Sequence, residues 1–353
     1  MIKVFREGSE ISGWKSVSVG LSLSSVCNGF SFEQFVGDDF SSPVLFPGDA
    51  VRIENDGVLL LDGFVDGTDI SFSADSHSIV VNGREKTCDL VDGSLSDYGR
   101  SWKNKTPQQI IEDICSSFGL MFSYNGVKSG TKIVRFCPDP GCTGLDAIMD
   151  VCKQRDLYCT SFGDGVVRLV NTDAYEYVTD MIEQGKNIIS ASANFSNADR
   201  FKKYTVLCSS NVKSKRKGEA VDDEILRDRC MVVVDDGFEN SGSAEQKAAY
   251  EAQMRSARST SVRVTLSGWR MSNGKLWKPG TLVDCLIPAF FGKNVQTLLV
   301  NSVIFTYDNS GSFVDLNLVR SDYYTPMPHR KKKSKANPWA GIQQKTSAYE
   351  ASR

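Results

Sequence analysis

One short motif occurs near both ends of the chain. Pro47-Gly48-Asp49-Ala50-Val51 opens one block of alternating apolar residues, and Pro279-Gly280-Thr281-Leu282-Val283 opens another. Each motif is followed by a strand-like run, a turn, a second run, a polar turn and a last strand that carries an arginine, Arg84 or Arg320. The prolines lie 232 residues apart and the arginines 236, so a four-residue insertion separates the two spacings. This matched order predicts a duplicated β-unit, which favours a scaffold over an enzyme.

Length and composition fit a soluble protein of more than one domain. The chain has 353 residues, enough for two or three domains of about 100–200 residues, with 41% hydrophobic and 24% charged residues. Its net charge of -2 is unevenly spread, because residues 327–353 hold seven Lys or Arg against one Glu. An acidic body with a short basic tail argues against a broad basic face for nucleic acid. No apolar run approaches the ~18 residues of a membrane span, and residues 1–7 lack the apolar stretch of a signal peptide, so we expect synthesis in a cytoplasm.

The cysteines do not form a recognisable metal or disulfide pattern. There are ten, none in a C-x-x-C pair, and only two histidines, His77 and His329. A zinc site would need four thiolates from scattered positions. We expect reduced cysteines that act as small hydrophobic residues, as the apolar surroundings of Cys115, Cys152 and Cys285 indicate.

Between the two blocks the sequence predicts helices and further strands. Thr106-Pro107-Gln108-Gln109 has the pattern of a capping box, and an apolar face follows up to Gly119, which is suited to the C-terminal cap. A second helix is expected around 145–155, followed by a hairpin whose strands, 157–162 and 166–170, are joined at Gly163-Asp164-Gly165.

The segment after this hairpin is less regular. We expect strands at 204–208 and 231–234, a charged mobile stretch at 211–228, and a helix at 244–259 that Ser243 could cap. Residues 262–266 resume the strand alternation and open the second block, and the Pro-containing basic segment after Tyr324 predicts a disordered tail.

Candidate chemistry is sparse. His77 lies in a predicted turn and His329 in the tail, so neither is placed to join a nucleophile and an acid. No P-loop and no G-x-G-x-x-G is present. The acidic groups fit solvated turns better than a metal or general-acid site; they are Asp62, Asp66 and Asp69, then Asp222, Asp223 and Glu224, then Asp235 and Asp236. We therefore predict no catalytic residues, no cofactor and no metal.

Several segments in order resemble the baseplate hub protein of Mu-like contractile-tailed phages. The first block carries Phe46 to Ile53, Leu61 to Asp66 and the stretch V-N-G-R-E-K-T-C-D-L-V-D at 81–92, similar to the S-G-R-D-x-T-x-D-L-V-D-type stretch of that family. Further matches are the 145–155 helix with its G-D-G hairpin, Asp199-Arg200-Phe201 before Tyr204, and the late segments 267–270, 274–279, 298–300 and 323–326. The sequence departs from the pattern at 206–209, where a G-Q pair is expected, and at Gly280, which replaces an asparagine.

The resemblance covers residues 1–326 and implies a mainly β, α+β fold with two related β-barrel domains. It implies a non-enzymatic, ring-like homotrimer with pseudo-sixfold symmetry that joins the tail tube to the central spike in the virion tail baseplate, after synthesis in the host bacterial cytoplasm. Neither a small-molecule substrate nor a membrane partner is implied. As a physical route to the ring we expect exposed strand edges of neighbouring modules to pair. The matching positions, without assigned roles, are Pro47, Gly48, Gly83, Arg84, Asp89, Asp92, Arg200, Trp269 and Pro279.

The expected domains are a first β-barrel domain (1–100), an α+β insert (101–190), a connecting β/α segment (191–260), a second β-barrel domain (261–326) and the basic disordered tail (327–353). Two other functions stay open at this point. A tail-associated cell-wall hydrolase would need paired carboxylates in a cleft, and a glycan- or nucleic-acid-binding β-module would need a binding surface on the body of the chain.

Overall fold

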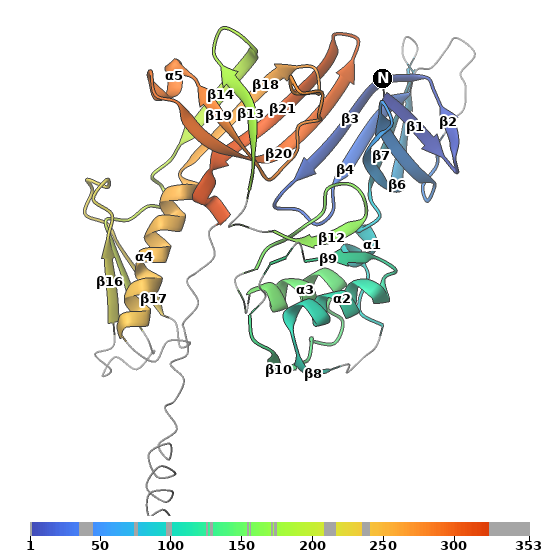
Figure 1. The fold of residues 1–353 in the computed structure, drawn as a ribbon. Helices are drawn as coiled ribbons and strands as arrows, with labels where there is room; N and C mark the ends of the chain where they lie inside the picture. The colour runs from blue at the N-terminus through green and yellow to red at the C-terminus, as the bar shows by residue number, and fades with distance from the viewer. Residues whose placement is uncertain are drawn as a thin grey trace, which may run out of the picture.

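The computed structural model describes residues 2–34, 45–73, 77–96, 101–124, 126–127, 130–153, 155, 157–170, 172, 175–207, 217–234 and 241–324. The fold is mainly β with a few helices, as expected. Figure 1 shows one large sheet along one side of the molecule and two smaller α/β units beneath it. The expected tail, Asp235, Asp236 and His329 lie outside the described residues.

The large sheet has thirteen strands from both ends of the chain. Its order is β14-β18-β21-β20-β3-β4-β7-β6-β5-β1-β2, with β19 and then β13 attached beside β20. No pairing between described strands closes this sheet on itself. The strands are β1 (Ile2–Arg6), β2 (Ser9–Ile11), β3 (Trp14–Ser22), β4 (Gly29–Gln34), β5 (Ala50–Asn55), β6 (Val58–Phe72), β7 (His77–Glu85), β13 (Glu176–Glu183), β14 (Ile188–Phe195), β18 (Thr260–Ser267), β19 (Thr281–Leu286), β20 (Gln296–Asp308) and β21 (Gly311–Arg320).

Alternating side chains give this sheet one continuous core. In β3, Val17, Val19 and Leu21 point inward while the intervening serines stay partly exposed, which is the period of two that the sequence predicted. The same core cluster includes Val262 and Val264 of β18, so both ends of the chain bury apolar surface together. We call β1 and β3–β7 the first half of the sheet, and β13, β14 and β18–β21 the second half.

The α+β insert below the first half forms a second core. The predicted capping box is confirmed: the Thr106 hydroxyl accepts from the Gln109 amide, and the Gln109 side chain accepts from the Thr106 amide. The helix ends in a Schellman motif, in which Leu120 N–H donates to Cys115 and Gly119, at φ 69°, donates to Ser116. The elements are α1 (Cys88–Asp92), β8 (Trp102–Lys105), α2 (Pro107–Ser117), β9 (Met121–Ser123), β10 (Ile133–Phe136), α3 (Gly144–Lys153), β11 (Cys159–Thr160) and β12 (Val166–Leu169).

The third unit lies below the second half and differs from the sequence prediction in two places. β16 (Lys217–Val221) lies within the stretch expected to be mobile, because it pairs with β15 (Lys203–Leu207), which in turn pairs with β17 (Cys230–Val234). Helix α4 (Ser241–Arg258) begins before Ser243, so that residue lies inside the helix and not at its cap. The small residues of α4, Ala244 and Ala248, are fully buried against this sheet. A 3-10 helix, η1 (Ser321–Tyr324), follows β21.

Candidate assembly interface

The two Pro-Gly turns have the same geometry. Gly48 has φ 94° and donates its N–H to the Val65 carbonyl of β6 at 2.8 Å. Gly280 has φ 82° and donates to the Val300 carbonyl of β20, also at 2.8 Å. Both glycines use the left-handed backbone region, which asparagine tolerates better than most residues. The change at Gly280 is therefore compatible with an unchanged turn.

The strands that follow these turns are arranged alike in both halves. In the first half the order is β3-β4-β7-β6-β5-β1, and in the second half it is β14-β18-β21-β20-β19-β13. The corresponding strands also follow each other in the same order along the chain. One pairing differs: β1 is antiparallel to β5, whereas β13 is parallel to β19. The duplication expected from the motif is thus present in the topology.

The register agrees residue by residue and corrects one part of the sequence alignment. A bulge separates Val65 from Gly67 opposite β7, and the same bulge separates Val300 from Ser302 opposite β21. These registers place Glu85, rather than Arg84, in the position of Arg320. Matching the two arginines was wrong by one residue. Compared with the first block, the second block contains three extra residues, between β19 and β20, and not four.

A direct strand pairing joins the two halves. β3 runs antiparallel to β20, with Leu21 opposite Val303 and Val19 opposite Phe305. These four side chains are buried, and Phe305 is fully so. β20 thus pairs with β19 before its bulge and with β3 after it.

The Trp269 position lies next to this junction. Its indole N–H donates to the Thr306 carbonyl at 2.9 Å, and its ring centroid lies 5.4 Å from that of Phe305. On the same side, Arg270 donates to the carbonyl and side-chain oxygens of Asn55 at 3.0 and 2.7 Å. The loop after β18 therefore holds the two halves together from a second direction. The two motif prolines differ in burial: Pro279 is buried, whereas Pro47 is exposed.

The family-motif residues at the end of β7 connect the sheet to the insert. Arg84 forms bidentate ion pairs with Asp66, the bulge residue of β6, and with Asp92 of α1, each with a shortest distance of 2.6 Å. The hydrogen bonds to Asp92 and then Asp66 raise the pKa of Arg84, and the same contact lowers the pKa of Asp92. Asp89 of α1 is exposed. A Cβ on Gly83 would overlap both the Phe30 ring and the Phe64 carbonyl, so this site requires glycine.

A buried carboxylate beside this corner was not found from the sequence. Glu85 is fully buried, and its carboxylate accepts from Asn28 Nδ2 at 2.7 Å, from the Gly165 N–H at 2.8 Å and from the Ser161 hydroxyl. Burial raises its pKa, and the hydrogen bonds from Ser161 and Asn28 oppose that shift. Its partners are far apart in the sequence, so only the G-D-G hairpin hinted at this contact. Glu85 attaches the insert to the first half.

Arg200 lies in the third unit, away from the other motif positions. Its guanidinium donates to Asp222 at 2.9 Å and to Glu224 at 2.6 Å, and its side chain is 8% exposed. Burial opposes its charge, but the hydrogen bonds to Glu224 and Asp222 still raise its pKa. These contacts fasten the segment after β14 to the turn after β16, which is a structural role.

The acidic groups do not converge on a reaction centre. Asp62 pairs with Lys86 at 2.6 Å, Asp66 with Arg84, and Asp69 accepts from Asn82 at 3.3 Å. Within the described part of the chain, no three His, Cys, Asp or Glu side chains are grouped to hold a metal ion. The described cysteines are all free, and burial raises the pKa of Cys115 and Cys285 to about 12, so both are thiols.

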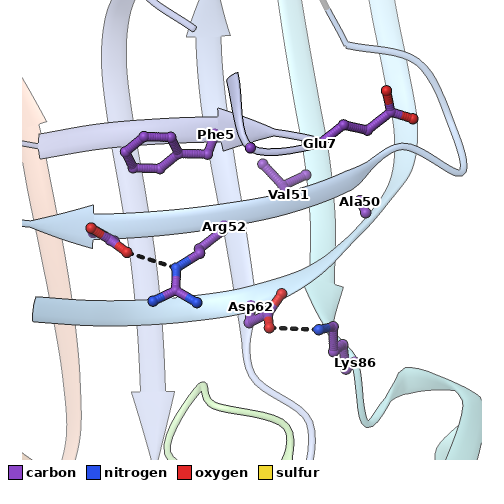
Figure 2. A pocket seen from close by; sticks show the side chains of 9 residues that line it. Phe5, Glu7, Ala50, Val51, Arg52, Asp62 and Lys86 are labelled. Carbon is purple, nitrogen blue, oxygen red and sulfur yellow. Dashed lines mark hydrogen bonds and ion pairs between the residues drawn. The ribbon is translucent and has the colours of Figure 1, made fainter. Parts of the chain in front are cut away.

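One open hollow over the first half of the sheet also lacks a built site. This hollow has a volume of about 450 Å³ and lies over β1, β5 and β6. Arg52 pairs with Glu54 on its wall, and Figure 2 shows the ion pair of Asp62 with Lys86. Apart from Glu7, its charged side chains thus already pair with each other. No described helix is long and apolar enough to cross a membrane.

Three family descriptions match successive parts of the chain. Residues 1–85 match "Mu phage baseplate assembly protein GpP-like, N-terminal", residues 87–171 "Baseplate hub protein gp44-like, second domain", and residues 240–327 "Mu phage baseplate assembly protein GpP, fourth domain". The chain is 28% identical over 346 residues to the baseplate hub protein gp44 of Escherichia phage Mu, covering 93% of this chain and 90% of that protein. It belongs to the Mu-like baseplate hub family.

Solved structures of similar fold agree with this membership. The 43 kDa tail protein of prophage MuSo2 from Shewanella oneidensis is 27% identical and superposes with a TM-score of 0.83 over 93% of this chain and 99% of that one. The tail protein from Neisseria meningitidis MC58, at 17% identity, shares the fold with a TM-score of 0.74 over 92% and 98% of the two chains. As a member of the family the chain is a baseplate hub protein, a structural component of a phage tail.

Proposed function

We propose that this hub protein acts without catalysis as a homotrimer with pseudo-sixfold symmetry. In the virion tail baseplate, it joins the tail tube to the central spike. Each half of the large sheet serves as one β-barrel-type module of the ring, so three chains supply six modules. The chain is synthesised in the host bacterial cytoplasm before tail assembly.

The repeated strand order of the two halves is the observation that carries this proposal. A threefold assembly offers a sixfold partner six similar contacts only if each chain contributes two similar modules. The sheet supplies two such modules, joined rigidly through β3 and β20 and sharing one hydrophobic core. A flexible linker between them would not fix their relative rotation.

The absence of catalysis is supported by how the polar groups are used. Of the carboxylates named as candidates, Asp62 is paired with Lys86, Asp66 with Arg84, Asp69 with Asn82, and Asp222 and Glu224 with Arg200, in separate places. Their partners explain them as structural contacts.

Native mass spectrometry and end-on electron microscopy of the purified full chain test the proposal. We expect a mass of three 38.9 kDa chains and class averages with six similar lobes. The matched control is a chain ending at Tyr324, which should give the same mass, because the modules and not the tail form the ring. A single-chain mass at micromolar concentration, or averages with three unlike lobes only, would contradict the proposal.

A further inference from the structure

Among the strand edges of the large sheet that lack a partner in the described strands, two occupy places equivalent to a junction inside the chain. The first belongs to β6 after its bulge: residues 67–72 pair with β7 on one side, but β5 pairs only as far as Phe64 on the other. Here Ile70 is 53% and Phe72 82% exposed, high values for apolar side chains in a strand.

The second edge belongs to β14, the end strand of the sheet. β14 pairs only with β18 among the described strands, and Ile189 and Phe195 are each 55% exposed. The two edges lie on opposite sides of the β3–β20 junction in the strand order, and Figure 1 shows β14 and β6 far apart on the two sides of the molecule. They cannot pair within one chain.

The register shows that these two edges correspond to the two strands that pair inside the chain: β14 corresponds to β3, and residues 67–72 of β6 correspond to part of β20. Val17 and Val19 of β3 correspond to Ala191 and Ala193 of β14, because each pair occupies the same place opposite β4 or β18. The bulges agree as well: one residue, Lys15 in β3 and Ile189 in β14, is skipped at the same place. Residues 302–307 of β20 correspond to residues 67–72 of β6.

We propose that β14 of one chain pairs antiparallel with residues 67–72 of β6 in a second copy of the chain, repeating the β3–β20 junction. This assignment rests on the proposed ring and names its contact between subunits. The in-chain register, transferred strand for strand, places Thr68 opposite Phe195, Ile70 opposite Ala193 and Phe72 opposite Ala191 of the neighbouring copy.

The side-chain sizes at these positions are complementary. Inside the chain the opposed pairs are Leu21 with Val303, Val19 with Phe305, and Val17 with Tyr307. Across the inferred contact, the small Ala193 and Ala191 face the large Ile70 and Phe72, while the large Phe195 faces the small Thr68. Each opposed pair thus combines one large with one small residue, which suits close packing.

The contact is also of the kind that closes a ring. Each copy offers two different edges, one from each half, so the contact is head-to-tail and not self-complementary. Copies joined in this way leave neither of these two edges unpaired once the ring is closed. That removes the aggregation hazard of exposed apolar strand edges.

Disulfide trapping across the inferred contact tests the register. Opposed residues in antiparallel strands have Cα atoms ~4.5–5.5 Å apart, within the range that a disulfide spans. In a full-length background in which the two cysteines exposed in the described part of the chain are removed (Cys137→Ser, Cys230→Ser), we expect Ile70→Cys with Ala193→Cys to convert most of the protein to a covalent trimer under mild oxidation. Thr68→Cys with Phe195→Cys is the second pair, should the first destabilise the fold.

Two controls are built into the same chain. Ile70→Cys or Ala193→Cys alone should give no dimer, because a head-to-tail contact never brings two identical positions together. Ile70→Cys with Ser190→Cys, three residues out of register and ~10 Å apart along the strand, should also stay uncross-linked. Dimers from a single cysteine, or trapping by the out-of-register pair alone, would overturn the inferred contact.

The outcomes separate this inference from the proposed function. If native mass spectrometry of the unmodified protein gives a trimer but neither in-register pair cross-links, the contact is wrong and the ring stands. If the unmodified protein is a single chain and neither pair cross-links, both are wrong.

Discussion

The two halves of the large sheet share one strand order but differ in what covers their equivalent edges. In the first half, β3 is covered by β20, and its inward side chains Val17 and Val19 are at most 1% exposed. In the second half, the equivalent strand β14 pairs with β18 on one side but has no described partner on the other, and Ala191 and Ala193 stand in the equivalent places. The same strand arrangement thus occurs twice: in the first half its edge strand is covered by the chain itself, and in the second half no described strand covers it.

This difference supports the proposed assembly, in which a neighbouring chain covers the outer edge of β14. A free end strand in a protein that works alone is usually blunted by charge, proline or a covering loop. β14 instead carries the sequence I-I-S-A-S-A-N-F, without charge or proline. The predictions below test how far the halves are equivalent, beginning with the junction that is complete.

Truncating Phe305 should have the largest effect. Phe305 is fully buried between β3 and Trp269, so Phe305→Ala is expected to cost about 3–5 kcal/mol of unfolding free energy. Its counterpart Ile70 is 53% exposed, and Ile70→Ala should change the single chain by no more than ~0.5 kcal/mol. Urea unfolding measures both.

The dependence of stability on protein concentration distinguishes the same two variants further. The loss in Phe305→Ala should not depend on concentration, whereas Ile70→Ala should lose stability only where the unmodified protein is assembled. Equal losses at every concentration would mean that Ile70 is covered within its own chain.

A substitution at Gly83 compares the two halves at a second pair of equivalent positions. Gly83 corresponds to Leu318, and Phe30 corresponds to Val262, so one half combines glycine with a large ring and the other two medium-sized side chains. Gly83→Ala should cost roughly 1–3 kcal/mol, because the added methyl overlaps Phe30 and the Phe64 carbonyl. Gly67→Ala, which meets nothing within 4 Å, is the matched control and should be near neutral.

A double variant separates the two clashes at Gly83. Phe30→Val removes the ring but not the Phe64 carbonyl, so Phe30→Val with Gly83→Ala should lose less than the sum of the single variants. Strict additivity in urea unfolding would show that the ring does not limit this site.

These residues also show which parts of the architecture could be read from the sequence. The Pro-Gly motif and the alternation of β3 predicted the duplicated β-unit, and Thr106 with Gln109 predicted the start of α2, because these signals are local. The alignment of Arg84 with Arg320 was wrong by one residue. The residue type alone suggested this match, whereas the true correspondence follows from the register of each strand with its partner.

The parts that were not predicted depend on distant partners. β14 was not predicted, because the apolar residues that alternate in it, Ala191 and Ala193, are small and neither of its faces is fully buried within one chain. The sequence of β16 is charged, and it forms a strand because it pairs with β15. From the sequence alone Glu85 cannot be told from an exposed acid, because the residues that surround it, Asn28, Ser161 and Gly165, are distant in the sequence. The positions of the inferred contact between copies were missed for the same reason, since they carry exposed apolar residues in weak patterns.

Removing the buried carboxylate should cost less than the core variants. Glu85→Ala leaves the Asn28 amide and the Ser161 hydroxyl without their buried acceptor, so we expect a loss of about 1–3 kcal/mol at pH 7. The equivalent residue Arg320, which pairs with Asp322 and whose side chain is 43% exposed, is the control: Arg320→Ala should lose clearly less.

The pH dependence has a definite sign. Burial raises the pKa of Glu85 in the folded protein above its ordinary 4.5, so the folded state holds this proton more tightly than the unfolded state. As pH rises through 4.5, the unfolded carboxyl ionises first, and stability contributed by this group is lost until its raised pKa is passed. Glu85→Gln cannot ionise, so it should gain stability relative to the unmodified protein across this window. A constant difference in urea unfolding from pH 4 upward would contradict the assignment.

The smallest effect is expected at Arg84, whose clamp has no counterpart because Val319 occupies its place in the second half. Arg84→Gln removes the ion pairs to Asp66 and Asp92, but these groups are partly exposed, so solvent already screens much of the attraction. We expect a stability loss below that of Glu85→Ala, which shrinks further in 1 M salt because screening weakens the pairs in the unmodified protein. The loss should be local: amide hydrogen exchange should speed up in α1, which Asp92 ties to β7, and not in β21. Exchange that rises equally in both halves would mean that Arg84 stabilises the whole sheet and does not simply fasten the insert to the first half.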